Sequence, residues 1–194
     1  MLNLPNILSF SRILLVPVLV VLLLTEPRFN NQEWVGLGVF LLASLTDFLD
    51  GFIARRRRQI TKLGKLLDPA ADKILTAAAY ISLVELKVAP SWIVTVLISR
   101  EFAVSALRAF AASEQVVISA SVSAKVKTTI QIISIALLII YNQLGEFRHL
   151  APVSLWATLL ITAYSGIEYF IRFGRLILKG EVPIHLFPPS GPRQ

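Results

Sequence analysis

The chain has no cysteine and few charged residues, and both absences narrow its possible functions. Without cysteine, the 194 residues can form no disulfide, thiolate nucleophile or thiolate metal site. Only two histidines are present, so a bound metal ion must rely mainly on oxygen ligands. Charged residues make up 16% of the chain and hydrophobic residues 55%, whereas soluble domains are about 25% charged. This composition predicts an integral membrane protein with a single membrane-embedded domain over residues 1–180.

Long apolar runs recur from about residue 7 to residue 172. A membrane-spanning helix needs about 20 mostly apolar residues, and six segments approach this requirement. We therefore predict an all-α fold with six transmembrane helices. A short interfacial segment at Pro5 and Asn6 precedes them, and a mobile tail over residues 181–194 follows them. The predicted helices cover about residues 8–25, 34–57, 68–86, 90–112, 120–142 and 151–173.

The basic residues are distributed asymmetrically along the chain. Three of the 19, Arg28, Lys87 and Arg148, lie in the links after the first, third and fifth predicted helices. The others lie in or near the N-terminus, residues 55–65, residues 108–127 and the C-terminal tail. The positive-inside rule then places both termini on the cytoplasmic side. The basic residues lie in short segments between apolar runs, which favours anionic lipids or an anionic substrate over nucleic acid as the partner.

Four of the 12 acidic residues lie close together between two apolar segments. Asp47 and Asp50 are three residues apart, and Asp68 and Asp72 are four apart, so each pair occupies one helix face. Converging carboxylates repel one another unless cations are present, and all-oxygen ligation favours Mg²⁺ or Mn²⁺. Two such ions would suit phosphoryl transfer. The alternative is that the acids simply pair with the neighbouring arginines and lysines.

The stretch DFLDGFIARRRRQITKLGKLLDPAAD fits the pattern D-x2-D-G-x2-A-R-x8-G-x3-D-x3-D, and so resembles the CDP-alcohol phosphotransferase family. The resemblance implies a six-helix membrane fold, two divalent metal ions, a CDP-lipid substrate and a homodimer. It also implies that all four aspartates contact the metals and that Asp72 acts as general base. It places the CDP-lipid beside Asn6, Gly51, Ala54, Arg55 and Gly64, the last of these as a loop glycine.

The second half of the chain indicates an acceptor alcohol that carries phosphate. Arg100 and Arg108 are eight residues apart and therefore lie on roughly one helix face, and Lys125 and Lys127 open the next helix. Such fixed cations fit a phosphate group. Arg108 and the two lysines could equally anchor the helices at lipid head groups. Arg100 lies deeper in the membrane, so its charge needs a partner there. We predict that this partner is Glu101 or an acid of the aspartate cluster.

Three further segments resemble the members of this family that use glycerol 3-phosphate. They are R-E-x4-A-L-R from Arg100, K-x-K-T-x2-Q from Lys125, and PNILSFSR, in which Ser9 replaces a threonine. The resemblance implies that CDP-diacylglycerol and glycerol 3-phosphate give phosphatidylglycerophosphate and CMP at the inner membrane. Two alternatives stay open. One is another member of the family, such as a cardiolipin synthase that uses phosphatidylglycerol. The other is a transporter of divalent metal ions or protons that uses the acids as a permeation site.

Overall fold

The computed structural model describes residues 4–26, 31–57, 62–113 and 122–178, with side chains for 10–26, 31–46, 70–113 and 126–175. Most of these residues are helical and none lies in a strand, which confirms the all-α prediction. The 3₁₀ helices Tyr141–Gln143 and Gly145–His149 precede the last α-helix. The α-helices are α1 (Leu4–Leu24), α2 (Gln32–Arg57), α3 (Lys62–Glu85), α4 (Ser91–Ser113), α5 (Val122–Ile139) and α6 (Leu150–Leu178).

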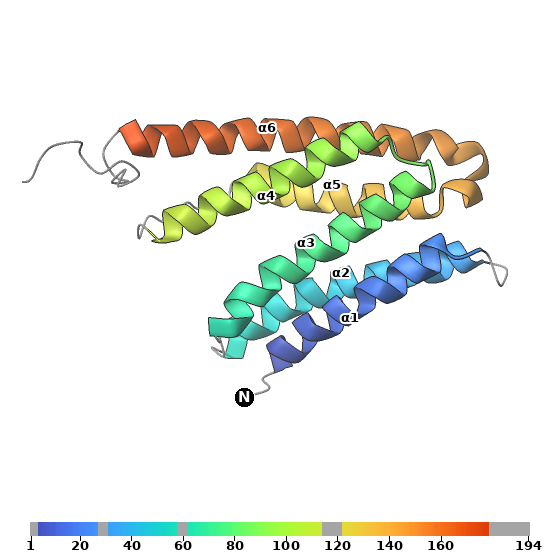
Figure 1. Cartoon of the computed structure of the whole chain (residues 1–194), viewed down its shortest axis with the longest axis horizontal. Helices are drawn as coiled ribbons and strands as arrows, with labels where there is room; N and C mark the ends of the chain where they lie inside the picture. Colours follow the sequence, from blue (N-terminus) through green and yellow to red (C-terminus); the bar gives the residue numbers. More distant parts are fainter. Residues whose placement is uncertain (1–3, 27–30, 58–61, 114–121, 179–194) are drawn as a thin grey trace, which may run out of the picture.

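Successive helices run in opposite directions, so the bundle has two distinct ends (Figure 1). One end collects the starts of α1, α3 and α5 and the ends of α2, α4 and α6. α1 packs against α2 and α3, while α6 packs against α4 and α5. The contacts of α3 with α4 and α5, and of α2 with α5, join these two groups. A site formed by α3, α4 and α5 therefore lies between the two halves of the bundle.

The core of the bundle is apolar, and much of the outer surface is apolar as well. Leu19, Phe40, Leu83 and Leu138 come from four different helices and are essentially inaccessible to solvent. Large hydrophobic side chains on the outer faces are half or more exposed, among them Leu14, Leu42, Ile81, Leu160 and Ile167. Extended apolar surface of this kind is typical of a helix bundle that contacts lipid.

One helical segment of the described residues, Gly145–Arg175, is long and apolar enough to cross a membrane. Shorter apolar helical stretches cover Phe10–Leu24, Gln32–Thr46 and Val126–Ile139. The number and order of the α-helices agree with the sequence analysis, but the count of six membrane spans stays a prediction. The predicted tail over 181–194 lies outside the described residues.

Two predicted boundaries are wrong. α3 begins at Lys62 rather than at residue 68, so Gly64 lies in its first turn and not in a loop. Gly64 costs only about 1 kcal/mol in a helix, but Pro69 also lies inside α3, where a proline typically costs about 3 kcal/mol. Packing of α3 against α1 and α2, rather than local propensity alone, therefore sustains its first turns. Asp72 consequently lies ten residues, or about 15 Å, from the start of α3. α1 begins at Leu4 and includes Pro5 and Asn6, because proline is tolerated in a first turn. The segment at Pro5 and Asn6 is therefore continuous with the first helix, and its interfacial position stays a prediction.

Candidate functional site: a cationic cavity beside Asp72

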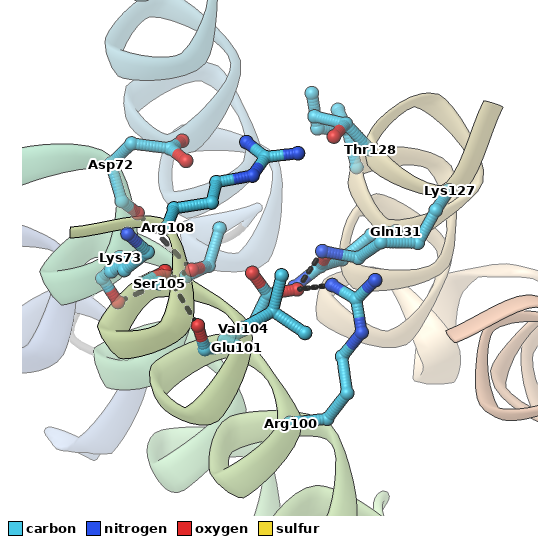
Figure 2. Close-up of a pocket in the computed structure, with 12 residues that line it drawn as sticks. Asp72, Lys73, Arg100, Glu101, Val104, Ser105, Arg108, Lys127, Thr128 and Gln131 are labelled. Carbon is cyan, nitrogen blue, oxygen red and sulfur yellow. Dashed lines mark hydrogen bonds and ion pairs between the residues drawn. The ribbon is translucent and has the colours of Figure 1, made fainter. Parts of the chain in front are cut away.

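A polar cavity of about 210 Å³ lies between α3, α4 and α5 (Figure 2). Pockets for drug-sized ligands usually measure about 300–1,000 Å³, so this cavity suits a small polar molecule rather than a lipid. Its neutral polar lining includes Thr76, Ser105, Thr128 and Gln131. The charged side chains that line it are Asp72, Lys73, Arg100, Glu101, Arg108 and Lys127.

The charges around the cavity do not cancel. Four of the charged lining residues are basic and two are acidic, which leaves a formal charge of +2. Low-dielectric walls strengthen such a field and raise the local concentration of ions of the opposite sign. The cavity is therefore suited to a small anion that carries about two negative charges.

Glu101 holds two of these cations in place. Its Oε1 forms an ion pair with the Nζ of Lys127 and lies 3.8 Å from an Nη atom of Arg100. All three side chains are largely buried, with relative exposures of 7% for Lys127, 12% for Arg100 and 18% for Glu101. Buried charges are tolerated only when they are paired. The partner that we predicted for Arg100 from the sequence is thus Glu101, shared with Lys127.

α6 holds the two arginines from the other side. Arg100 donates a hydrogen bond of 2.7 Å from Nη2 to Oγ of Ser165. Arg108 donates a hydrogen bond of 2.7 Å from Nε to the hydroxyl of Tyr169, and its guanidinium carbon lies 4.8 Å from the centre of that ring. The sequence analysis missed Ser165 and Tyr169. The only local signal for them is that two polar side chains stand one turn apart in an apolar helix.

Asp72 lies at the edge of the cavity, on α3. Its carboxylate points towards the guanidinium of Arg108 (Figure 2). The backbone carbonyl of Asp72 accepts a hydrogen bond of 3.1 Å from the hydroxyl of Thr76, one turn later. A carboxylate beside a pocket for an anion can accept a proton from a hydroxyl group of the molecule bound there.

The structure thus brings Asp72, Arg100, Arg108 and Lys127 together around one cavity. Their predicted roles are not tested by this geometry. In the part of the chain with described side chains, no group of three or more acidic or histidine residues converges. That part contains only Asp72 of the aspartate quartet. The backbones of α2 and α3, which carry the quartet, pack against each other. The side chains of the remaining predicted site residues lie outside the described part: Asn6, Asp47, Asp50, Gly51, Ala54, Arg55, Gly64, Asp68 and Lys125.

Comparison with known proteins defines the class of this protein. Residues 2–164 match the family model of the CDP-alcohol phosphatidyltransferases, so the chain belongs to that family. This confirms the resemblance carried by the aspartate pattern. The matched range includes all four aspartates and all four predicted cations of the acceptor site.

Individual relatives are similar over most of their length. The chain is 39% identical to the CDP-diacylglycerol--glycerol-3-phosphate 3-phosphatidyltransferase of Bacillus subtilis, over 89% of this chain and 95% of that protein. It is 35% identical to the protein of the same name from Rickettsia typhi, over 87% and 95% of the two chains. A probable phosphatidylglycerophosphate synthase of Mycobacterium tuberculosis is 34% identical, over 88% of this chain and 81% of the relative.

Proposed function

We propose that this protein transfers a phosphatidyl group from CDP-diacylglycerol to glycerol 3-phosphate, giving phosphatidylglycerophosphate and CMP. The observation that carries the proposal is the small cavity with a net charge of +2 that has Asp72 at its edge. Glycerol 3-phosphate is a small, doubly charged anion with a primary hydroxyl group, and so it fits both features. The names of the relatives from Bacillus subtilis and Rickettsia typhi support the same reaction.

The acceptor binds through its phosphate. Arg100, Arg108 and Lys127 surround that group, with Lys125 as a further predicted contact. The bound 1-hydroxyl group then faces Asp72, which takes its proton. The hydroxyl oxygen forms a bond to the phosphorus atom that carries diacylglycerol, and the bond from that phosphorus to CMP breaks. CMP leaves with the bonding electron pair.

The donor binds beside the aspartates. Its acyl chains remain in the bilayer, while its pyrophosphate and cytidine lie against the start of α1 and the end of α2. We assign this part of the site to Asn6, Gly51, Ala54, Arg55 and Gly64, in line with the sequence pattern. Gly51 and Ala54 leave room for the nucleotide because neither carries a bulky side chain.

Members of this family generally use divalent metal ions. We propose that Asp47, Asp50, Asp68 and Asp72 hold two such ions, Mg²⁺ or Mn²⁺, because carboxylate oxygens are the ligands these ions prefer. Asp72, whose side chain the structure describes, fits this assignment because it presents a carboxylate beside the cavity. Bound divalent ions would neutralise the pyrophosphate and stabilise negative charge on the transferring group.

We further propose that the bundle spans the inner membrane with its catalytic end in the cytoplasm. Family membership and the apolar helix Gly145–Arg175 support a membrane location. Trp34, Trp92 and Trp156 are about half exposed near the opposite end, where an aromatic belt is expected. The ring centres of Trp92 and Trp156 lie 5.6 Å apart. Residues 1–180 would act as one domain, and we expect a homodimer among anionic lipids.

An acceptor panel tests the proposed reaction. Purified protein supplied with CDP-diacylglycerol should release CMP with glycerol 3-phosphate, and much more slowly with inositol phosphate, serine or phosphatidylglycerol. The physical reason is the size and charge of the cavity. CMP release that depends on phosphatidylglycerol would instead identify a cardiolipin synthase. Uptake of metal ions into liposomes without any CDP-lipid would favour the transporter.

Removal of metal ions tests the role of the aspartates. Excess EDTA should abolish CMP release, because the donor pyrophosphate and the four carboxylates would then repel each other. Addition of Mg²⁺ or Mn²⁺ beyond the chelator should restore the activity, whereas K⁺ at the same ionic strength should not. Undiminished turnover in EDTA would contradict the assignment of a metal site.

A further inference from the structure

Three residues of α6 form a wall against the two arginines of the cavity. Ser165 and Tyr169 are buried, with relative exposures of 0% and 1%, and Gly166 is buried as well. Their spacing places Ser165 and Tyr169 one turn apart on the same helix face. None of the three lines the cavity itself, and the match to the family model ends at residue 164.

Gly166 allows Arg100 to lie close to α6. A Cβ atom at position 166 would be 3.2 Å from Cγ of Arg100 and 3.5 Å from its Nε. An alanine would therefore push the arginine stem away from the helix by a few tenths of an ångström. The same stem ends in the hydrogen bond to Ser165. The Ser165 hydroxyl holds the end of the Arg100 side chain, and Gly166 leaves room for its stem. Together they fix one conformation of Arg100.

Tyr169 performs the equivalent task for Arg108. Arg108 is exposed, so burial alone does not restrict its side chain. The hydroxyl of Tyr169 accepts the hydrogen bond from Nε, and the ring lies beneath the guanidinium. An arginine side chain otherwise has up to about 2 kcal/mol of rotamer entropy to lose. Tyr169 keeps the two terminal nitrogens of Arg108 available to face the cavity.

We propose that Ser165, Gly166 and Tyr169 are positioning residues that set the affinity for the acceptor's phosphate by fixing Arg100 and Arg108. This inference rests on the proposed function, because it assumes that the two arginines bind the acceptor. The three residues act through the arginines and do not touch the substrates. They should therefore affect the acceptor and leave the CDP-lipid unaffected.

Kinetics of three variants test the proposal. Tyr169→Phe removes the hydroxyl and keeps the ring, Ser165→Ala removes the hydroxyl that Arg100 contacts, and Gly166→Ala adds the Cβ atom. Each should raise the KM for glycerol 3-phosphate by up to about 10-fold. This is below the roughly 10- to 150-fold that corresponds to a whole hydrogen bond to a charged group, because these residues act only through the arginines. The KM for CDP-diacylglycerol and kcat should stay unchanged. Inhibition by inorganic phosphate, competitive with the acceptor, should weaken in parallel.

Two substitutions on the same helix serve as matched controls. Tyr164 is 66% exposed, and a Cβ atom added at Gly174 would meet nothing within 4 Å, so Tyr164→Phe and Gly174→Ala should behave like the parent protein. Thermal unfolding in detergent shows which variants are folded. If Gly166→Ala does not fold, the KM of Tyr169→Phe for glycerol 3-phosphate tests the proposal in its place.

An unchanged KM for glycerol 3-phosphate in folded Tyr169→Phe would overturn the inference. Equal changes in the KM values of both substrates would overturn it as well. If the parent protein rejects glycerol 3-phosphate, the proposed function fails. The same comparison made with the acceptor that it does use then decides the inference on its own.

Discussion

Asp72→Asn is expected to reduce CMP release by at least about 10²- to 10⁴-fold, the range typical for loss of a general base. The amide has nearly the shape of the carboxylate but cannot take the proton of the acceptor hydroxyl. It is also a poorer ligand for a divalent cation. Single-turnover CMP release from CDP-diacylglycerol in detergent measures the effect on the chemical step.

The variant should be folded, because the carboxylate is only partly buried at the edge of the cavity. Thermal unfolding and helix content by circular dichroism check this point. Glu85→Gln is a matched control, since Glu85 is exposed at the far end of the same helix. If the Asp72→Asn variant turned over at the parental rate, Asp72 would have no place in the mechanism.

Arg100→Ala is expected to raise the KM for glycerol 3-phosphate about 10- to 150-fold. That range corresponds to about 1.5–3 kcal/mol for hydrogen bonds to a charged group. Arg100 lines the cavity and is held by Glu101 and Ser165, so its loss removes a positioned cation. Initial rates over a range of both substrates separate this effect from any change in the KM for CDP-diacylglycerol.

Two further variants define what Arg100 contributes. Arg100→Lys keeps the charge but loses the planar fork that binds phosphate through two donors, so its KM should lie between those of the parent and Arg100→Ala. Arg172→Ala is the matched control, because Arg172 is exposed and pairs with Glu168 at 2.5 Å on the outer part of α6. A change confined to the KM for CDP-diacylglycerol would remove Arg100 from the acceptor site.

The helices and much of the candidate site follow from patterns that are local in the sequence. Apolar runs of sufficient length predict the α-helices, and the spacing of Arg100 and Arg108 predicts a shared face. The start of α3 was harder to predict, because the segment around Gly64 is basic and contains a glycine. Gly64 and Pro69 both disfavour a helix there, and the contacts of α3 with its neighbouring helices outweigh them, so the helix begins six residues earlier than predicted.

Contacts between distant helices could not be predicted in this way. The hydrogen bonds from Arg100 to Ser165 and from Arg108 to Tyr169 join residues 65 and 61 positions apart. The pairing of Lys127 with Glu101 likewise depends on how α4 and α5 are placed by their shared contacts with α3 and α6. No periodicity within one helix specifies the rotation of a neighbouring helix about its own axis. These contacts become visible only when the bundle is assembled.

Glu101 and Lys127 form a buried ion pair, with Arg100 beside it. This pair determines whether the cationic side chains lose their rotamer freedom on folding or on binding of the anion. Lysine and arginine each have up to about 2 kcal/mol of rotamer freedom, and here much of that freedom is already lost when the chain folds. An incoming anion meets side chains that are already aligned, so less ordering is left for the binding step. Folding therefore bears an entropic cost that would otherwise weaken recognition of the second substrate.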